Sequence, residues 1–280
     1  MEVAMTRIAR RFALLCPAGV APPPEPARAS ETPGLLATQV TIAVDRGGSR
    51  RQFRATVMAI EGETLTLLTA AHCLSAADEG GPALLLLGEG EVVEGSVLAV
   101  VRNPSYRDVP APGPAPGPGA EPGRTPKGPA AAPRRRAAPP RELPGPDNAL
   151  AKIRCKPANP PAEAAFRAIR PAPALTARTY PPPDGQTVAV RLIDGHGVEH
   201  SVRAGNHGNP RWLEWGPGYK PIPGDSGGGV FAIHTGADGQ ARPILIGIIV
   251  GNDDRGGGAS LVAREYPWIA RELPRLAADR

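Results

Sequence analysis

The sequence predicts an all-β protein that consists of two antiparallel barrels and ends in a helix. Short runs rich in Val, Leu, Ile and Thr recur on both sides of a proline-rich stretch, and turn residues separate them. Short strands at regular intervals are typical of antiparallel barrels. Only the end of the chain, 266–278, has the spacing of an amphipathic helix. The apolar face of this helix comprises Trp268, Ile269, Leu273 and Leu276.

The predicted strands fall into two groups. The first group comprises 39–44, 53–60, 64–70, 83–88, 91–101 and, after the proline-rich stretch, 150–154. The second group comprises 187–193, 198–205, 229–234, 243–251 and 260–264. Strands at regular short intervals on both sides of the proline-rich stretch favour two lobes over one large domain.

The stretch 107–146 interrupts the first group of strands. It contains 13 prolines and no aromatic residue, and its only β-branched residues are Val109 and Thr125. Such a composition cannot bury enough apolar surface to offset the entropy of ordering, so we expect a disordered or partly polyproline II insertion. The predicted organisation is an N-terminal segment at 1–34, a first lobe at 35–106 and 147–165, the insertion at 107–146, and a second lobe at 166–280.

The net charge of +5 does not indicate a nucleic-acid-binding protein. The insertion alone carries seven basic and three acidic residues, and the first thirty residues carry a net charge of +2. The rest of the chain therefore has a net charge of −1, whereas a nucleic-acid-binding domain is expected to have a basic face on its folded part. We interpret the run of three arginines at 134–136 as a solvated charge run.

The N-terminal segment resembles an export signal. It has a basic start and a short apolar run, and Ala27 and Ala29 surround a cleavage site of small residues. This pattern predicts a secreted or periplasmic protein. Pro17 interrupts the apolar run, so a cytoplasmic location stays open. No later apolar stretch reaches the roughly 20 residues of a membrane-spanning helix, so we expect no transmembrane segment.

Three separate stretches contain residues suited to nucleophilic catalysis. Ser226 lies in PIPGDSGGGV, His72 follows the apolar run of TLLTAAHC, and Asp147 follows the insertion. A serine hydroxyl needs a base to take its proton, and the pKa of histidine near 6.5 suits that task. A buried carboxylate would fix the tautomer of the imidazole. Each stretch alone also has an ordinary structural explanation, as a glycine-rich turn, a structural histidine or an Asp-Asn turn.

Together the three stretches resemble the chymotrypsin/trypsin family of serine peptidases, in the family's order His, Asp, Ser. TAAHC surrounds His72, DNALAKI begins at Asp147 and GDSGG surrounds Ser226. The resemblance covers about 35–279 and implies two six-stranded barrels with a C-terminal helix. It also implies a monomeric serine endopeptidase, bacterial in style, that acts on polypeptides through an acyl-enzyme and needs no metal or organic cofactor. The backbone N–H groups of Gly224 and Ser226 would form the oxyanion hole.

Two other functions compete with this interpretation. Gly224, Ser226 and Gly228 also fit the G-x-S-x-G motif of α/β-hydrolases, but those enzymes run Ser, acid, His. The only histidine after Ser226 is His234, which lies in a predicted strand, so this fold is disfavoured. A catalytically inactive relative that acts as a binding module stays open.

The chain departs from the family pattern around the candidate site. The family's first cysteine aligns near Arg54, which leaves Cys73 without its usual disulfide partner. The usual Ser-Trp-Gly is replaced by Val250-Gly251-Asn252, which removes a hydroxyl that often supports the aspartate. No Ile-Val-Gly-Gly precedes the first strand, so we expect no activation by a freed N-terminus, and the partner of Asp225 stays open.

The resemblance also assigns three residues to substrate binding. Lys220 lies six residues before Ser226, which in the family is the floor of the specificity pocket, and the other two residues are Val250 and Asn252. A lysine at the floor would attract an acidic side chain, or it would extend its amine to solvent.

A group of three histidines and one aspartate raises the question of a metal site. The group consists of Asp194, His196, His200 and His207. The sequence DGHG at 194–197 is typical of a hairpin turn. Residues four apart on a strand, such as His196 and His200, are roughly 13 Å apart, which is too far to bind the same metal ion. We therefore expect no metal site and interpret these histidines as exposed turn residues.

Overall fold

The computed structural model describes residues 34–87, 90–107, 146–173, 186–206, 211–235, 241–253 and 256–278. Most of the predicted N-terminal segment and most of the predicted insertion therefore lie outside the described residues. The account below concerns the described part of the unit that begins at Gly34.

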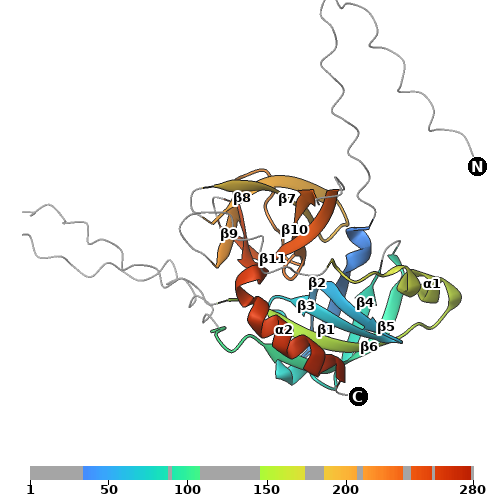
Figure 1. Cartoon of the computed structure of the whole chain (residues 1–280). Coiled ribbons are helices and arrows are strands. Elements are labelled where there is room, and N and C mark those ends of the chain that lie inside the picture. Colours follow the sequence, from blue (N-terminus) through green and yellow to red (C-terminus); the bar gives the residue numbers. More distant parts are fainter. Residues whose placement is uncertain are drawn as a thin grey trace, which may run out of the picture. The chain divides into compact units, whose positions relative to one another are not determined.

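The first barrel closes because its first strand pairs on both sides. Its strands are β1 (Gln39–Arg46), β2 (Ser49–Glu61), β3 (Thr64–Thr69), β4 (Pro82–Leu86), β5 (Val92–Arg102) and β6 (Ala149–Lys156). They follow the order β1-β2-β3-β6-β5-β4, and β1 also pairs with β4. Every pairing is antiparallel (Figure 1).

The second barrel has the same design. Its strands are β7 (Thr187–Ile193), β8 (Glu199–Gly205), β9 (Trp212–Trp215), β10 (Gly229–Thr235), β11 (Ala241–Asp253) and β12 (Gly256–Leu261). They follow the order β10-β11-β12-β9-β8-β7, and β10 also pairs with β7. Register shifts in β10 and β11 bend the strands as closure requires. The predicted fold class, two closed six-stranded antiparallel barrels with a C-terminal helix, is confirmed.

The C-terminal helix packs against the first barrel. The C-terminal helix α2 (Val262–Ala278) lies along the first barrel (Figure 1), where the buried amine of Lys152 donates to the carbonyl oxygens of Leu276 and Ala277 at 2.7 and 3.0 Å. These bonds satisfy carbonyls that a helix end leaves without partners. Among the described residues, no helix has the length and apolar character needed to span a membrane.

The sequence-based prediction missed helix α1 (Pro160–Ala168) and strand β9, and it was wrong to extend the last strand to 264, because α2 already begins at Val262. Helix α1 contradicts the expectation that only the end of the chain is helical. It begins with proline, and the Asn159 side chain accepts a hydrogen bond from the N–H of Ala162, a capping pattern typical of helix starts. Strand β9 is only four residues long, too short for its alternation to be recognised. Two short 3-10 helices, Leu36–Thr38 and Ala76–Asp78, complete the described elements.

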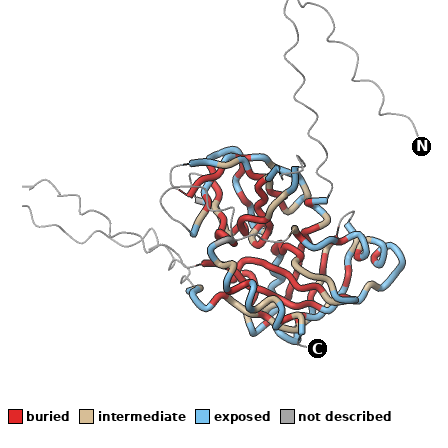
Figure 2. The backbone as a smooth tube through the Cα atoms, in the orientation of Figure 1, coloured by how far each residue is buried: buried red, intermediate tan, exposed pale blue. Residues whose placement is uncertain are grey.

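The two barrels share part of one hydrophobic core. Buried residues run through both barrels in Figure 2. The core cluster that fills the first barrel also includes Phe231, Leu245 and Ile248 of the second, and a separate cluster fills the second barrel itself. The shared cluster fixes one barrel against the other, and the candidate site depends on this arrangement.

One buried polar side chain allows a test of packing. Asn148 is fully buried, and its Oδ1 and Nδ2 bond to no described group. Because an unsatisfied buried amide is costly, we expect Asn148→Leu to raise the free energy of unfolding by about 1 kcal/mol and the Tm by about 3 °C. Thermal unfolding followed by circular dichroism measures this.

Asn103 provides the matched control for this test. Its Nδ2 donates to Glu265 Oε2 at 2.7 Å, and its Oδ1 accepts from Ser105 N at 3.0 Å. Asn103→Leu should therefore lower the Tm. A lower Tm for Asn148→Leu would show that the amide contributes to stability after all.

Candidate active site

His72 lies just beyond the end of β3, in a tight turn. The Cys73 N–H donates to the Ala70 carbonyl at 3.0 Å, and Ala70 and Ala71 are completely buried. The imidazole keeps 38 % of its surface exposed. The small residues before His72 thus let the backbone pack closely while the ring extends to the surface.

Asp147 lies two residues before the start of β6, which pairs with β3. In this register Thr69 pairs with Ala149, so the residues after one strand end lie beside those before the other. Asp147 Oδ2 lies 2.6 Å from His72 Nδ1, and Oδ1 accepts the His72 backbone N–H at 3.0 Å. The bond to Nδ1 orients the ring, and the bond to the backbone N–H fixes the carboxylate beside it. Among the described residues Nε2 has no hydrogen-bond partner and is the free ring nitrogen.

The environment of His72 changes its basicity. Burial lowers the pKa of the imidazole, but the hydrogen bond to Asp147 and the adjacent Cys73 sulfur outweigh this and raise the pKa to about 10. A protonated ring cannot accept a proton, so a reaction that uses His72 as base needs a pH high enough to deprotonate it.

This shift predicts a pH dependence. NMR titration of the labelled His72 ring should give a pKa well above 6.5, and the reaction rate should rise with pH over the same range. In Asp147→Asn the charged partner is lost, so both curves should move to lower pH. Identical titration curves in the two proteins would contradict a charge-stabilising role for Asp147.

Ser226 lies in a loop of the second barrel that contacts the first barrel through its backbone. Its carbonyl oxygen accepts the N–H of Arg54 in β2 at 2.8 Å. The Arg54 carbonyl in turn accepts the hydroxyl of Thr69 at 2.8 Å, three residues before His72. A chain of two hydrogen bonds thus connects the Ser226 backbone to the end of β3 that precedes His72.

The loop around Ser226 also presents two unused donors. Gly224 has a φ of +107° and Gly227 a φ of +89°. The neighbouring N–H groups of Gly227 and Gly228 donate to Ile249 and Asp225, whereas those of Gly224 and Ser226 donate to no acceptor within the described ranges. Two free backbone donors beside a serine are suited to stabilising a developing oxyanion.

Asp225 has partners that the sequence did not reveal. The carboxylate is fully buried and accepts hydrogen bonds from the backbone N–H groups of Gly195 and Ile222 and from the hydroxyl of Tyr219. Burial and this hydrogen bond raise the pKa of Tyr219, so its hydroxyl stays protonated and donates. No periodicity or motif marked these residues.

The three residues assigned to substrate binding lie in different environments. Lys220 is exposed, and Val250 packs against the shared core. The Asn252 side-chain amide donates to the carbonyl oxygen of Pro221 in the loop that leads to Ser226. Asn252 therefore reaches from the end of β11 to that loop.

The two described thiols are both buried. Cys73 and Cys155 are free within the described part of the chain, and Cys16 lies outside it. Phe53, which precedes Arg54 near the position of the family's first cysteine, is buried in the core of the first barrel.

The histidines near the second barrel differ from the prediction in one case. His196 is exposed, as expected, whereas His207 lies outside the described residues. His200 is half-buried, bonds to Asp194 through Nε2 at 2.8 Å and stacks on Tyr219, so its interpretation as an exposed turn residue is wrong. In the described part of the chain, no cluster of three or more His, Cys, Asp or Glu residues could hold a metal ion.

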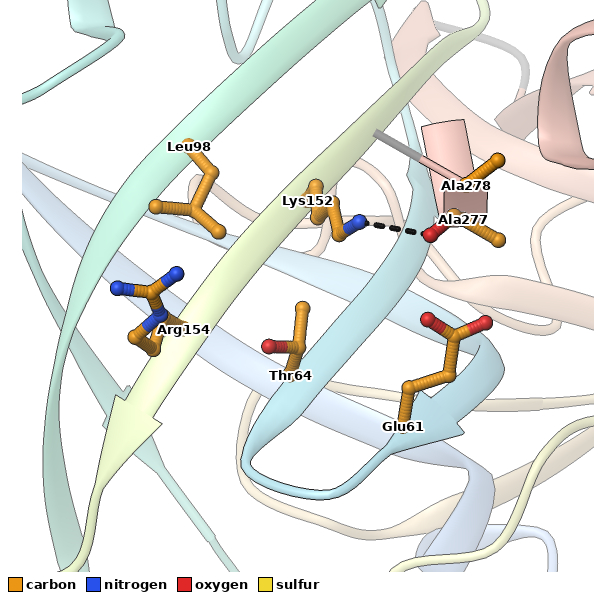
Figure 3. Close-up of a pocket in the computed structure, with 7 residues that line it drawn as sticks. All are labelled: Glu61, Thr64, Leu98, Lys152, Arg154, Ala277 and Ala278. Atoms are coloured by element: carbon orange, nitrogen blue, oxygen red, sulfur yellow. Dashed lines mark hydrogen bonds between the residues drawn. The ribbon is translucent and has the colours of Figure 1, made fainter. Parts of the chain in front are cut away.

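A separate hollow of about 530 Å³ lies on the first barrel beside the end of α2 (Figure 3). Glu61, Thr64, Leu98, Lys152, Arg154, Ala277 and Ala278 line it. Lys152 points across it to the helix carbonyl. None of the candidate catalytic residues lines this hollow.

Comparison with solved structures identifies the fold as trypsin-like. The chain is similar to the structure of GrC, with 14 % identity and a TM-score of 0.50 over 85 % of this chain and 94 % of that one. It is also similar to an inactivated protease paralogue of the scabies mite, S-I1, with 12 % identity and a TM-score of 0.51 over 88 % of this chain and 98 % of that one. No protein-family model and no curated protein sequence matches the chain. At this identity the likeness shows the fold alone.

Proposed function

We propose that the protein is a serine endopeptidase in which Ser226 attacks the peptide carbonyl, His72 takes its proton and Asp147 orients the imidazole. The pair of hydrogen bonds between His72 and Asp147 carries this proposal, because it leaves Nε2 free to act as the base. The free N–H groups of Gly224 and Ser226 would bind the tetrahedral oxygen. His72 would pass the proton to the departing amine as the C–N bond breaks, and water would then hydrolyse the acyl group from Ser226.

A catalytically inactive binding module is the second candidate. Two features favour it: Val250 provides no hydroxyl to support Asp147, and Asn252, which the resemblance assigns to substrate binding, donates instead to the carbonyl oxygen of Pro221. In this case the surface around Ser226 would bind a polypeptide without cleaving it.

Labelling with a fluorophosphonate probe distinguishes the two candidates. A peptidase should form a single adduct on Ser226, and the adduct should disappear in Ser226→Ala and in His72→Ala. Peptide mapping by mass spectrometry locates the adduct. A folded wild-type chain that does not react at Ser226 would support the binding module.

A further inference from the structure

The aspartate beside the candidate nucleophile is held from three directions. Gly195 N donates to Asp225 Oδ1 at 2.6 Å, and Ile222 N and the Tyr219 hydroxyl donate to Oδ2 at 2.7 and 2.5 Å. These donors come from the turn after β7 and from the loop that leads to Ser226. A buried carboxylate needs such donors, because burying a charge without hydrogen-bond partners is strongly unfavourable.

Tyr219 is itself held in place. Its ring stacks on His200 with centroids 4.2 Å apart, and its backbone carbonyl accepts the indole N–H of Trp215 at 2.9 Å. His200 in turn bonds to Asp194. The Tyr219 hydroxyl therefore reaches Asp225 from a side chain that has little freedom to move away.

The first barrel supports the same group of residues. The guanidinium of Arg54 donates to the Asp194 carbonyl and to Gln39 Oε1, and its positive charge lies close to both Asp194 and Asp225. The backbone N–H of Arg54 holds the Ser226 carbonyl. One residue of β2 thus supports both the buried carboxylates and the loop of the candidate nucleophile.

We propose that Tyr219, together with the N–H groups of Gly195 and Ile222, fixes Asp225 and thereby positions the donors of Gly224 and Ser226 without any contribution from a freed chain N-terminus. The inference rests on the proposed peptidase function. Tyr219 is a positioning residue, because it acts through Asp225 and does not touch the reacting atoms. The ammonium group of a freed N-terminus could pair with Asp225 only by displacing these donors, because the carboxylate has no exposed surface.

Gly195 lies close to Asp225 Oδ1, the carboxylate oxygen that Tyr219 does not bond. A Cβ at this position would lie 3.1 Å from Asp225 Oδ1, which is tighter than an ordinary contact. Gly195→Ala should therefore push on the carboxylate from the side opposite Tyr219 and act as an independent second variant.

The test combines two measurements on the full chain. In Tyr219→Phe, which keeps the ring and removes only the hydroxyl, hydrogen exchange in peptides covering 219–228 should rise at least about tenfold. Fluorophosphonate labelling and kcat should fall by about 10- to 100-fold, somewhat less than the loss of a complete oxyanion donor, with KM within about threefold. Gly195→Ala should change both quantities in the same direction.

Tyr266→Phe is the matched control, because it removes a hydroxyl from α2, away from this loop, and should behave as the wild type. A chain extended before Met1 should also react at the wild-type rate. Unchanged exchange in Tyr219→Phe, faster exchange with unchanged labelling, or a slower extended chain would each overturn the inference. A wild-type chain that fails to react refutes the proposed function instead, and the exchange measurement alone then decides whether Tyr219 holds the loop.

Discussion

At a pH high enough to deprotonate the imidazole, His72→Ala is expected to lower kcat for peptide hydrolysis by about a million-fold, because a serine hydroxyl is a poor nucleophile and the imidazole is its base. Its removal leaves the buried Asp147 carboxylate with only the backbone N–H of residue 72 as a partner, so the free energy of unfolding should also fall at neutral pH. Steady-state hydrolysis of a fluorogenic peptide and thermal unfolding of the same samples measure the two effects.

Two controls make this result specific. Ser226→Ala should cause a loss of the same size, and the double variant should be no slower than either single one, since residues that act as a unit are not additive. His234→Ala replaces an exposed histidine of β10 and should leave the rate unchanged. Losses that multiply in the double variant would show that His72 and Ser226 act independently.

Gly227→Ala is expected to disrupt the loop of the candidate nucleophile. A Cβ at this position would lie 1.9 Å from the Arg54 carbonyl oxygen and 2.1 Å from Thr69 Oγ1, and the residue has a φ of +89°. The first contact is with backbone, which cannot rotate away, so the loop and β2 must separate. We expect a loss of about 4 kcal/mol or more in the free energy of unfolding, together with loss of labelling at Ser226.

Gly62 provides the matched control for steric contact. It has a φ of +60°, and a Cβ added there would have no atom within 4 Å, so Gly62→Ala adds backbone strain alone. We expect it to cost roughly 1–2 kcal/mol and to leave labelling intact. Urea denaturation measures both variants. Equal losses would mean that the close approach of the two barrels at Gly227 is unimportant.

The sequence predicted what is encoded in contiguous residues. Most strands were recognisable because their apolar runs are long and end at turn residues, and the two-barrel fold followed from their number and spacing. The candidate His, Asp and Ser were recognisable because each lies in a short motif. The hydrogen bonds between His72 and Asp147 depend on the pairing of β3 with β6, which no local pattern specifies.

The partners of Asp225 could not be predicted for the same reason. Gly195 lies thirty residues before Asp225, and its contribution is a backbone N–H group, which any residue type except proline would possess. His200 resembled an exposed turn residue because its neighbours are polar, but the fold stacks it on Tyr219. Helix α1 was missed because its apolar face is short, with Ala162 and Phe166 as its buried residues.

The central claim is that His72 and Ser226 act on the same carbonyl group. A peptidyl chloromethyl ketone tests it directly, because its ketone takes the place of the scissile carbonyl and its chloromethyl carbon then lies beside the base. Mass spectrometric mapping should find the inhibitor attached to His72, and Ser226→Ala should slow this attachment by at least about a hundredfold. Attachment to His72 at the same rate in Ser226→Ala, or no attachment to a folded wild-type protein, would contradict the claim.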